Sequence, residues 1–555
     1  MHIQAHTSSL ALALVALALP SGVHAQQIQA EDVQPEGKPA VRTSHVEIQP
    51  YIEAAQIFTA QLEPVNDSVT YTSVAAGVDA TMRGRNSAAS AAVRYERRFG
   101  YDDNFRDSDT VSGVARASVG LGSPNVTIEA GALASRTRVD SNGVATTGAF
   151  AQNDRETSQV YSGYVGPSVR SRQGPVEVEG HYRFGYTRVE SPDVIVAAPS
   201  GPARVDLADE STTHMASARV GLAPRTVLPV GVGVGGGWNE QNTSNLDQRV
   251  RDRHVRGDVT LPVTESIALV GGAGYEDVEV SSRDALRDPV TGVPVIGPDG
   301  RYVTDDTAPR RIAYETDGLI WDAGVMWRPS RRTSLQAFVG KRYDSTTYYG
   351  SFAYAPNSRE SFNVSVYDGI QTFGGVITDR LAGLPAQFRA IRNPFSGDIG
   401  GCVSSTQGNN CLGGAFGSLN SAVFRDRGIS LSYGLDLGRT QLGLGAGYDR
   451  RTFIAATGTV LAAANGIVDE NYWAAVYAGT RLDERSSITG NLYASMYDSG
   501  LSGDRAIGYS ASLAYARQLI AGLSGTAALG LDGVSQDNLP DLQSASALVG
   551  LRYSF

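Results

Sequence analysis

Apolar and polar residues alternate along most of this chain with a period of two, as expected for β-strands that have one apolar face and one polar face. The stretch from Ser544 to Phe555 shows the pattern most clearly. Every second residue from Ala545 onward is apolar, and Leu548 is the one exception among the residues between them. The pattern predicts a chain built largely of two-faced strands.

The carboxyl terminus adds a second signal, because the chain stops on an aromatic residue while the predicted strand is still running. Strands that end in Phe resemble the terminal strands of bacterial outer-membrane β-barrels. This resemblance implies that Tyr553 and Phe555 form an assembly signal, and that outer-membrane lipids and the barrel assembly machinery are partners.

The same alternation recurs throughout the chain, for example in 176–187, 319–328, 429–438 and 442–449. Short turns and longer connections follow one another, which is the asymmetry of barrels with short periplasmic turns and longer outer loops. The short turns are expected at 84–86, 122–125, 172–175, 223–225, 264–266, 329–333, 357–359, 438–440, 483–486 and 520–522. The longer connections are expected at 140–157, 191–211, 283–314, 373–427 and 455–469.

These patterns predict an all-β protein: a single large antiparallel transmembrane β-barrel over residues 45–555. We expect about 22 strands, within a range of about 18–24, and no separate plug domain. The mean hydropathy of −0.17 and the lack of a mature apolar run near about twenty residues exclude a helical membrane protein. The 63 glycines and 25 tyrosines suit tightly paired strands with aromatic belts.

The amino terminus predicts export. An apolar segment from Ser8 to Leu19 is followed by Val23-His24-Ala25, which fits a small-residue cleavage rule before Gln26. We therefore expect a signal peptide at 1–25 and a disordered periplasmic tail at 26–44, too short for a folded plug. The predicted location is the bacterial outer membrane.

Candidate chemistry is sparse. The segment Gly231–Gly236 formally matches a dinucleotide-binding pattern, but it is expected to be a strand with no helix after it, so glycines that let the wall bend are the better interpretation. The mature histidines are scattered, and the formal charge of −10 argues against a nucleic-acid partner. We predict no catalytic residue, metal site or cofactor, and therefore no enzyme.

Charged residues on the polar phase of the strands are the candidates for lining a lumen. Rings of such residues set solute selectivity in channels, whereas mixed Arg and carboxylate pairs across neighbouring strands also simply hold a wall together. The mixture of signs predicts no cation or anion preference. The candidates are Arg94, Glu96, Arg98, Glu177, Glu179, Arg183, Arg219, Arg256, Asp258, Asp322, Arg328, Arg342, Asp436, Asp449, Arg451 and Arg552.

The two cysteines, Cys402 and Cys411, lie in the longest predicted loop. In an exported chain they are expected to close a small disulfide loop. That loop could fold into the lumen as a constriction or cover the outer surface, and the sequence does not separate these arrangements.

A family resemblance lies around Trp327-Arg-Pro-Ser-Arg-Arg-Thr-Ser-Leu335, followed by Gly340-Lys-Arg-Tyr343 and Thr347-Tyr-Tyr-Gly-Ser351. The segment resembles outer-membrane β-barrels encoded with exopolysaccharide and exosortase (PEP-CTERM) systems, related to the β-barrel porin 2 group. The resemblance implies a role in moving or anchoring surface polysaccharide, with polysaccharide-export components as partners.

The function predicted from the sequence is a passive outer-membrane channel that assists polysaccharide export or admits a polar solute. The alternative is a surface receptor or adhesin whose barrel only displays its long loops. A plugged, energy-coupled transporter would need a plug domain before the first strand, and the alternation already begins near Val46.

Overall fold

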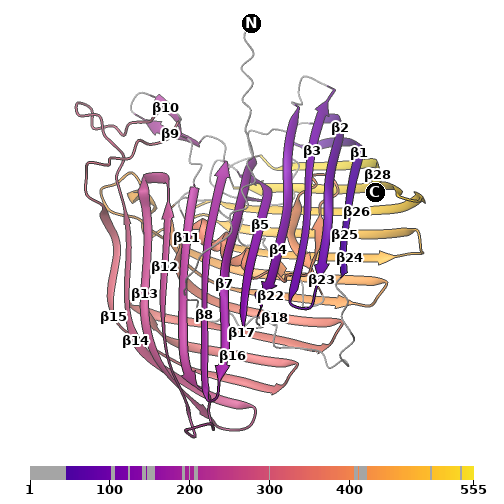
Figure 1. The fold of residues 1–555 in the computed structure, drawn as a ribbon. Helices are drawn as coiled ribbons and strands as arrows, with labels where there is room; N and C mark the ends of the chain where they lie inside the picture. The colour runs from indigo at the N-terminus through magenta and orange to yellow at the C-terminus, as the bar shows by residue number, and fades with distance from the viewer. Residues whose placement is uncertain are drawn as a thin grey trace.

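The described chain closes into one barrel (Figure 1). The structure is a computed structural model, and it describes residues 45–555 apart from 65, 102–106, 123–124, 140–144, 147–156, 191–193, 199–200, 206–209, 299, 406–409, 412–421, 501–502 and 538–539. Within these residues one antiparallel sheet contains 23 strands, and 22 of them form a closed ring. The remaining strand, β6 (Ala145–Thr146), pairs only with β5.

The ring strands pair in chain order, and β28 pairs with β1 to close the ring. Their bounds are β1 His45–Glu63, β2 Asp67–Arg83, β3 Ser87–Gly100, β4 Ser108–Gly120, β5 Val126–Val139, β7 Thr157–Gln173, β8 Val176–Glu190, β11 Glu210–Leu222, β12 Gly231–Thr243, β13 Gln248–Pro262, β14 Ile267–Ser282, β15 Arg311–Ser330, β16 Thr333–Arg342, β17 Ser345–Asn357, β18 Glu360–Gln371, β22 Val423–Asp436, β23 Thr440–Ile454, β24 Val468–Arg481, β25 Ser486–Asp498, β26 Arg505–Ile520, β27 Leu523–Gln536 and β28 Leu542–Ser554.

The shorter elements lie in the connections between ring strands. A separate hairpin of β9 and β10 projects near the top of the barrel in Figure 1. A helix and a three-stranded sheet occupy the connection between β18 and β22. These elements are β9 Val194–Ala198, β10 Gly201–Val205, η3 Asn245–Asp247, α1 Phe373–Ala382, β19 Arg389–Arg392, β20 Ile399–Ser404, β21 Asn410–Cys411 and η5 Ala462–Ala464.

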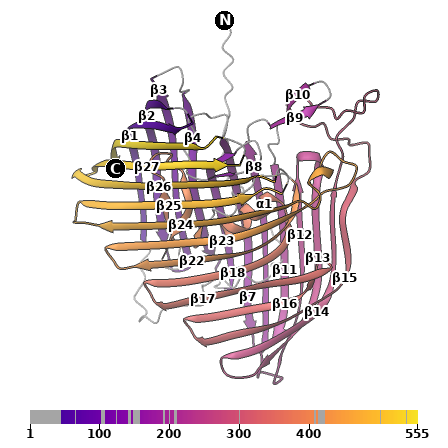
Figure 2. The ribbon, with the colours of Figure 1, turned by 180° about the vertical axis from the view of Figure 1, so that it is seen from behind.

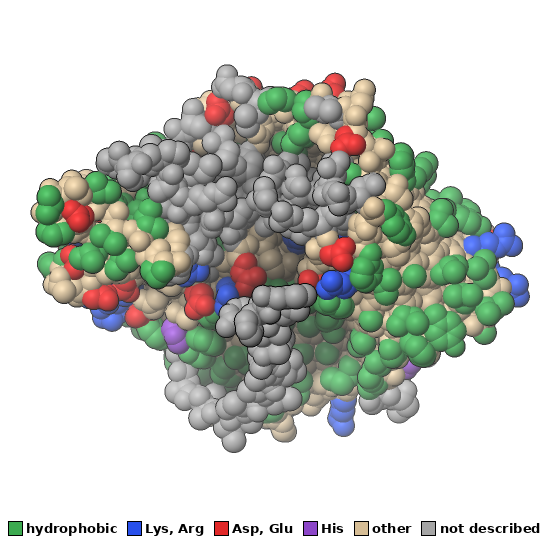
Figure 3. All heavy atoms as spheres, turned by 90° about the horizontal axis from the view of Figure 1, so that it is seen from above, with side chains coloured by type: hydrophobic (Ala, Val, Ile, Leu, Met, Phe, Trp, Pro, Cys, Tyr) green, Lys and Arg blue, Asp and Glu red, His purple; other side chains and the backbone are tan. Residues whose placement is uncertain are grey.

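The two faces of the strands are sorted as the alternation predicts, with the apolar face outward. On β28, Val549 and Leu551 are 68% and 51% exposed, whereas Leu548 between them is 4% exposed because it faces the interior. In Figure 3 hydrophobic side chains cover the flank of the barrel. A closed antiparallel barrel with an apolar outer band is the architecture of a bacterial outer-membrane protein, and the outer membrane is the location of this protein.

Loop length follows parity around the barrel. Every short turn predicted from the sequence joins two strands at the rim where β1 begins and β28 ends. The five longer connections, including 283–314 and 373–427, all fall at the opposite rim. By the usual asymmetry of such barrels, the turn rim faces the periplasm and the loop rim faces outward.

The carboxyl-terminal strand completes the ring rather than leaving an edge. β28 pairs with β1 from Tyr51↔Ser554 to Gln61↔Ser544, and the Phe555 N–H donates to the Pro50 carbonyl oxygen at 3.0 Å. The rings of Tyr553 and Phe555 meet edge to face, with centroids 5.0 Å apart. Closure matters because an unpaired strand edge cannot be hydrated within lipid.

The predicted signal peptide (1–25) and the predicted periplasmic tail (26–44) lie outside the described residues. Within the described part there is no separate plug domain. None of the described helices is long and apolar enough to cross a membrane.

The outward apolar band generates a depth-dependent prediction. Leu529 lies in the middle of β27, whereas Leu437 lies beside the β22–β23 turn, and the two are similarly exposed at 64% and 59%. We expect Leu529→Arg to lower the free energy of unfolding by about 2–4 kcal/mol and Leu437→Arg by about 0–1 kcal/mol, because a guanidinium at the bilayer midplane loses its hydration.

Urea unfolding of the protein folded into lipid vesicles, followed by tryptophan fluorescence, measures both values. Equal costs for the two Leu→Arg variants would show that the band does not face lipid as described.

Candidate functional site: the lumen and the loop that crosses it

The connection between β18 and β22, residues 372–422, is here named the lumen loop, and its described part folds into the barrel. Its helix α1 begins after Thr372, whose side-chain oxygen accepts the Gly375 N–H at 3.3 Å, a standard N-cap. Phe373, Ile377 and Leu381 recur at helical spacing and are all buried. The sequence therefore gives this loop an apolar helical face that requires a partner.

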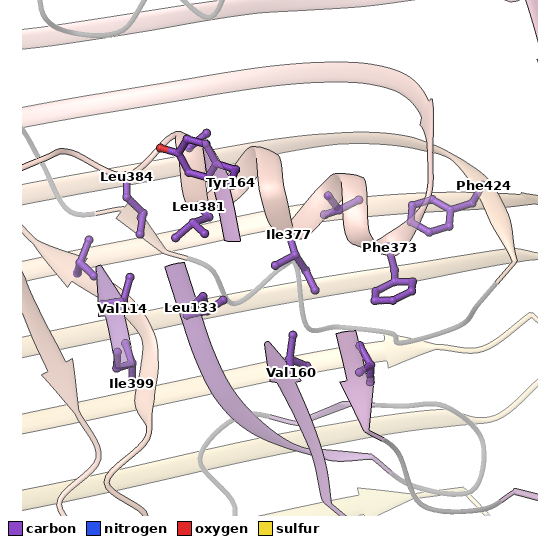
Figure 4. Close-up of a cluster of buried hydrophobic side chains, with 14 of the residues drawn as sticks. Val114, Leu133, Val160, Tyr164, Phe373, Ile377, Leu381, Leu384, Ile399 and Phe424 are labelled. Atoms are coloured by element: carbon purple, nitrogen blue, oxygen red, sulfur yellow. The ribbon is translucent and has the colours of Figure 1, made fainter. Parts of the chain in front are cut away.

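That partner is the inner wall of the barrel. The apolar face of α1 packs against Leu133 on β5 and against Val160 and Tyr164 on β7 (Figure 4). In Figure 2 the helix is seen between the strands of the near wall and those of the far wall. Of the two placements left open by the sequence, the structure shows the loop inside the lumen.

The start of the loop is anchored on β11 and β12. The Thr372 N–H and hydroxyl both donate to Oε1 of Gln241, at 2.7 and 2.9 Å. Gly374 and Gly375 allow this close approach, because a Cβ on them would lie 2.5 Å from the Ser211 side chain and 2.4 Å from the Gln241 side chain. Residues larger than glycine would push the helix off this wall.

Two adjacent helix residues reach different walls. Asp379 accepts a hydrogen bond from Arg183 on β8 at 2.8 Å. Arg380 donates to Asp449 on β23 at 3.2 Å and stacks over the Tyr367 ring, whose hydroxyl also donates to Asp449. The end of α1 therefore ties strands that are far apart around the ring.

The second half of the loop binds further strands through its own backbone. Arg116 on β4 donates to the carbonyl oxygens of Ala382 and Leu384, at 3.0 and 3.1 Å. Farther along, Ser112 donates to the Gly397 carbonyl oxygen at 3.0 Å, and Phe395 packs on Gly530 of β27.

The opposite side of the lumen is also contacted. Ile391 on β19 packs with Trp473 of β24 and Tyr493 of β25. Together with the contacts to β4 and β8, this places the lumen loop across the barrel rather than along one strand pair.

A buried ion cluster holds the wall beneath the tip of the loop. Glu96 on β3 accepts from Arg94 at 2.8 Å and from Arg98 at 2.7 Å, and all three are nearly fully buried. Arg94 also bonds to Glu53 at 2.7 Å. Arg98 donates to the Ser396 carbonyl oxygen at 3.2 Å, so the cluster joins the wall to the loop.

Asp398, also at the loop tip, is incompletely compensated. Its nearest cation is Arg136 on β5, at 3.7 Å, and its Oδ1 is buried without a hydrogen-bond partner. Burial raises the pKa of the Asp398 carboxyl above its usual value, although the nearby Arg136 and Arg98 oppose the rise.

A second group of charges forms a chain across alternate strands. Arg219 on β11 donates Nε to Asp258 of β13 at 3.1 Å, and Arg256 of β13 donates Nε to Asp322 of β15 at 2.6 Å. Arg256 also bonds to Asp258 at 3.2 Å, which links the two pairs. Each arginine crosses an intervening strand to reach its partner.

Glycines on the intervening strands make these crossings possible. A Cβ on Gly233 of β12 would lie 2.3 Å from the Arg219 guanidinium, and one on Gly272 of β14 would lie 2.2 Å from that of Arg256. The glycine run at 231–236 is a strand, as predicted. Its Gly233 leaves room for a guanidinium, a role that the bending interpretation did not include.

The chain of charges continues toward the turn rim on β7 and β8. Arg170 lies 3.3 Å from Glu179, and Arg172 lies 3.6 Å from Glu177. Glu179 is also the direct cross-strand partner of Arg219. We name the whole set the charge belt: Arg170, Arg172, Glu177, Glu179, Arg219, Arg256, Asp258 and Asp322.

A third group gathers around the tip of the β16–β17 hairpin. Arg342 donates to Asp252 on β13 at 2.8 Å and to Glu276 on β14 at 3.0 Å. Its guanidinium and that of Arg425 lie over the Tyr343 ring, 4.6 and 5.1 Å from the centroid. This hairpin tip is therefore fixed inside the outer part of the lumen.

The remaining predicted candidates lie apart from these groups. Arg451 is 4.0 Å from Asp426, and Arg552 donates to Asp79 at 2.8 Å. Asp436 accepts the Gly438 N–H at 2.7 Å beside a turn. Arg328 is exposed near the turn rim.

Several residues of these clusters were not predicted from the sequence. Asp252 and Glu276 occupy inward positions on their strands, so the alternation itself could have found them. Asp379, Arg380 and Asp398 lie on the lumen loop, where no strand pattern exists to indicate their position.

The predicted disulfide remains a prediction. Cys402 on β20 and Cys411 on β21 are direct cross-strand partners, but their side chains lie outside the described residues. No group of three or more His, Cys, Asp or Glu side chains in the described part is arranged to hold a metal ion.

Comparisons with known proteins found similar chains among solved structures alone. No family model matches the sequence, and no curated protein matches it. Among solved structures, it is similar to the closed form of the ferric-catecholate import receptor Fiu from E. coli K12 (TM-score 0.45, 9% identity, 91% of this chain and 81% of that chain).

It is also similar to the FrpB iron transporter from Neisseria meningitidis (TM-score 0.42, 10% identity, 95% and 83% of the two chains) and to the siderophore receptor PirA from Acinetobacter baumannii (0.41, 11%, 93% and 81%). These scores are low, and the closed ring of paired strands, rather than the likeness, establishes the barrel.

The buried cluster generates a stability prediction. We expect Glu96→Gln to lower the free energy of unfolding by about 3–5 kcal/mol, because it leaves Arg94 and Arg98 buried without their shared carboxylate. The matched variant Glu179→Gln, at a pair that is partly exposed, should cost about 0–1 kcal/mol.

Urea titration in vesicles measures both costs, and limited proteolysis reports whether the lumen loop becomes accessible in the Glu96 variant. If the two variants lose the same stability, the cluster does not hold the wall and loop together.

Proposed function

We propose that the protein is a selective outer-membrane channel for polar solutes, in which the lumen loop narrows the pore. The observation that carries the proposal is the crossing of the lumen by this loop, from Gln241 on β12 to Asp449 on β23. A ring of about 22 strands encloses a wide lumen unless something fills it.

The character of the inner wall supports a water-filled route beside the loop. Charged side chains such as Arg219, Arg256 and Glu179 are partly exposed on the inward face. Seen from above, the molecule is hollowed at its centre, and acidic and basic side chains border the hollow (Figure 3). A polar, hydrated wall favours passage of polar molecules and excludes apolar ones.

A surface receptor is the second candidate, and one observation favours it. Loops that lie apart around the loop rim contact each other, because the Val460 N–H of the β23–β24 loop donates to Asp284 at 2.9 Å. The β14–β15 loop also has internal bridges, such as Ala285↔Thr304. An ordered outer surface of this kind suits the binding of a ligand.

The identity of the solute and its direction of transport are separate from the channel proposal. Polysaccharide export, which the family resemblance implies, stays a prediction. The contacts described here favour a polar solute without distinguishing export from uptake.

Removal of the lumen loop tests the channel. Gln371 on β18 and Phe424 on β22 are cross-strand partners, so a short linker of about four residues can replace 372–422 and close the hairpin. We expect the wild-type protein to give small single-channel currents in planar lipid bilayers. The shortened variant should conduct about ten-fold more, because the wide lumen is no longer crossed.

A matched control replaces 283–310 of the β14–β15 loop, which lies at the rim, and should leave the conductance within about two-fold of wild type. Equal conductance of the wild-type and shortened proteins would show that the loop does not narrow the pore. Absence of current from both would overturn the channel and favour the receptor.

A further inference from the structure

The charge belt offers four guanidinium groups and four carboxylates to the lumen, each paired with an opposite charge on a neighbouring or next-nearest strand. We propose that the belt sets the specificity of the channel for solutes that carry no net charge, either neutral polar molecules or zwitterions. This inference rests on the proposed channel function.

The guanidinium groups of the charge belt are partly exposed, so a solute in the lumen can reach them. The side chains of Arg172 and Arg170 are 59% and 68% exposed, and those of Arg219 and Arg256 are 31% and 24% exposed. Its carboxylates are partly exposed on β8, where Glu179 is 34% exposed, and nearly buried on β13 and β15, where Asp258 and Asp322 are 4% and 10% exposed. The belt therefore runs from an open end near the turn rim into the wall.

The geometry of the belt keeps both signs of charge close together. A ring of one sign attracts the opposite ion and repels the other. Here the bidentate contact of Arg219 with Asp258 places a carboxylate within hydrogen-bond distance of the guanidinium. An ion of either sign therefore meets a repelling group beside each attracting group, whereas a solute with donors and acceptors can bond to both.

The glycines show that the belt lies against the wall rather than across the pore. Arg219 passes directly over Gly233, and Arg256 passes directly over Gly272. Because the guanidinium groups lie on the backbone, they stay near their carboxylates and leave the space in front of them to solute.

Two charges at the end of α1 are balanced in the same way. On the lumen loop, Asp379 pairs with Arg183 and Arg380 pairs with Asp449. The loop therefore adds no unpaired sign opposite the belt at these positions.

Reversal potentials in a KCl gradient test the proposal, measured in planar bilayers for the full-length and the loop-shortened protein. We expect the wild type to pass K⁺ and Cl⁻ about equally. The double variant Asp258→Asn with Asp322→Asn should become several-fold selective for Cl⁻. The double variant Arg219→Gln with Arg256→Gln should become several-fold selective for K⁺.

Matched controls make the same charge changes on the outward parity of the strands. Arg188→Gln with Arg505→Gln removes two positive charges, and Asp277→Asn with Asp317→Asn removes two negative charges. Neither should change the reversal potential. A heat-dependent shift in gel mobility confirms that each variant is a folded barrel.

A third variant separates charge from geometry. Gly233→Leu with Gly272→Leu keeps every charge but displaces both guanidinium groups from the wall into the lumen. We expect its conductance to fall while its ion preference stays close to that of wild type.

The outcomes are distinguishable. Currents that persist with an unchanged reversal potential in both belt variants would overturn the belt while leaving the channel intact. Absence of current from the wild-type and shortened proteins alike would overturn the channel, and the belt with it.

Discussion

The structure depends on one constraint: no backbone N–H or C=O group can remain unpaired in lipid. An antiparallel ring satisfies it, since every strand of the ring pairs on both sides and β28 returns to β1. The same ring imposes the two-residue period. The lipid outside favours apolar side chains such as Val549, so the polar side chains between them face the interior. There each polar side chain must be hydrated or must form hydrogen bonds or ion pairs with other groups of the protein.

This constraint explains which features could be predicted from the sequence. Strand number, the parity of short turns and long loops, and the outward placement of Leu551 all follow from a local pattern with a fixed period. The lumen loop has no such pattern. Its position depends on contacts between Gly374 or Gly375 and strands more than a hundred residues away, and neither propensity nor periodicity encodes those distances.

The charged residues divide in the same way. The alternation predicts that Arg219, Asp258 and Asp322 lie on the polar phase of their strands, but it could not indicate that arginines bond across an intervening strand. That arrangement requires a residue without a side chain on the intervening strand, beneath the guanidinium, as at Gly233. A glycine on the inward phase of a barrel strand is therefore informative when an arginine lies on the neighbouring strand, because the two together predict a bridge rather than a bend.

The loop and the charge belt use the inner wall differently. Where the loop docks, the wall supplies apolar contacts such as Leu133 and ion pairs that are almost fully buried, such as Glu96 with Arg98. Burying such pairs is costly unless all their bonding capacity is used, and the loop carbonyl of Ser396 uses part of it. Along the belt the guanidinium groups stay partly exposed, so water or a solute can accept the hydrogen bonds that their carboxylates leave unused. If the buried ion pairs lined the solute route and the exposed pairs lay beneath the lumen loop, the barrel would bind neither the loop nor a solute well.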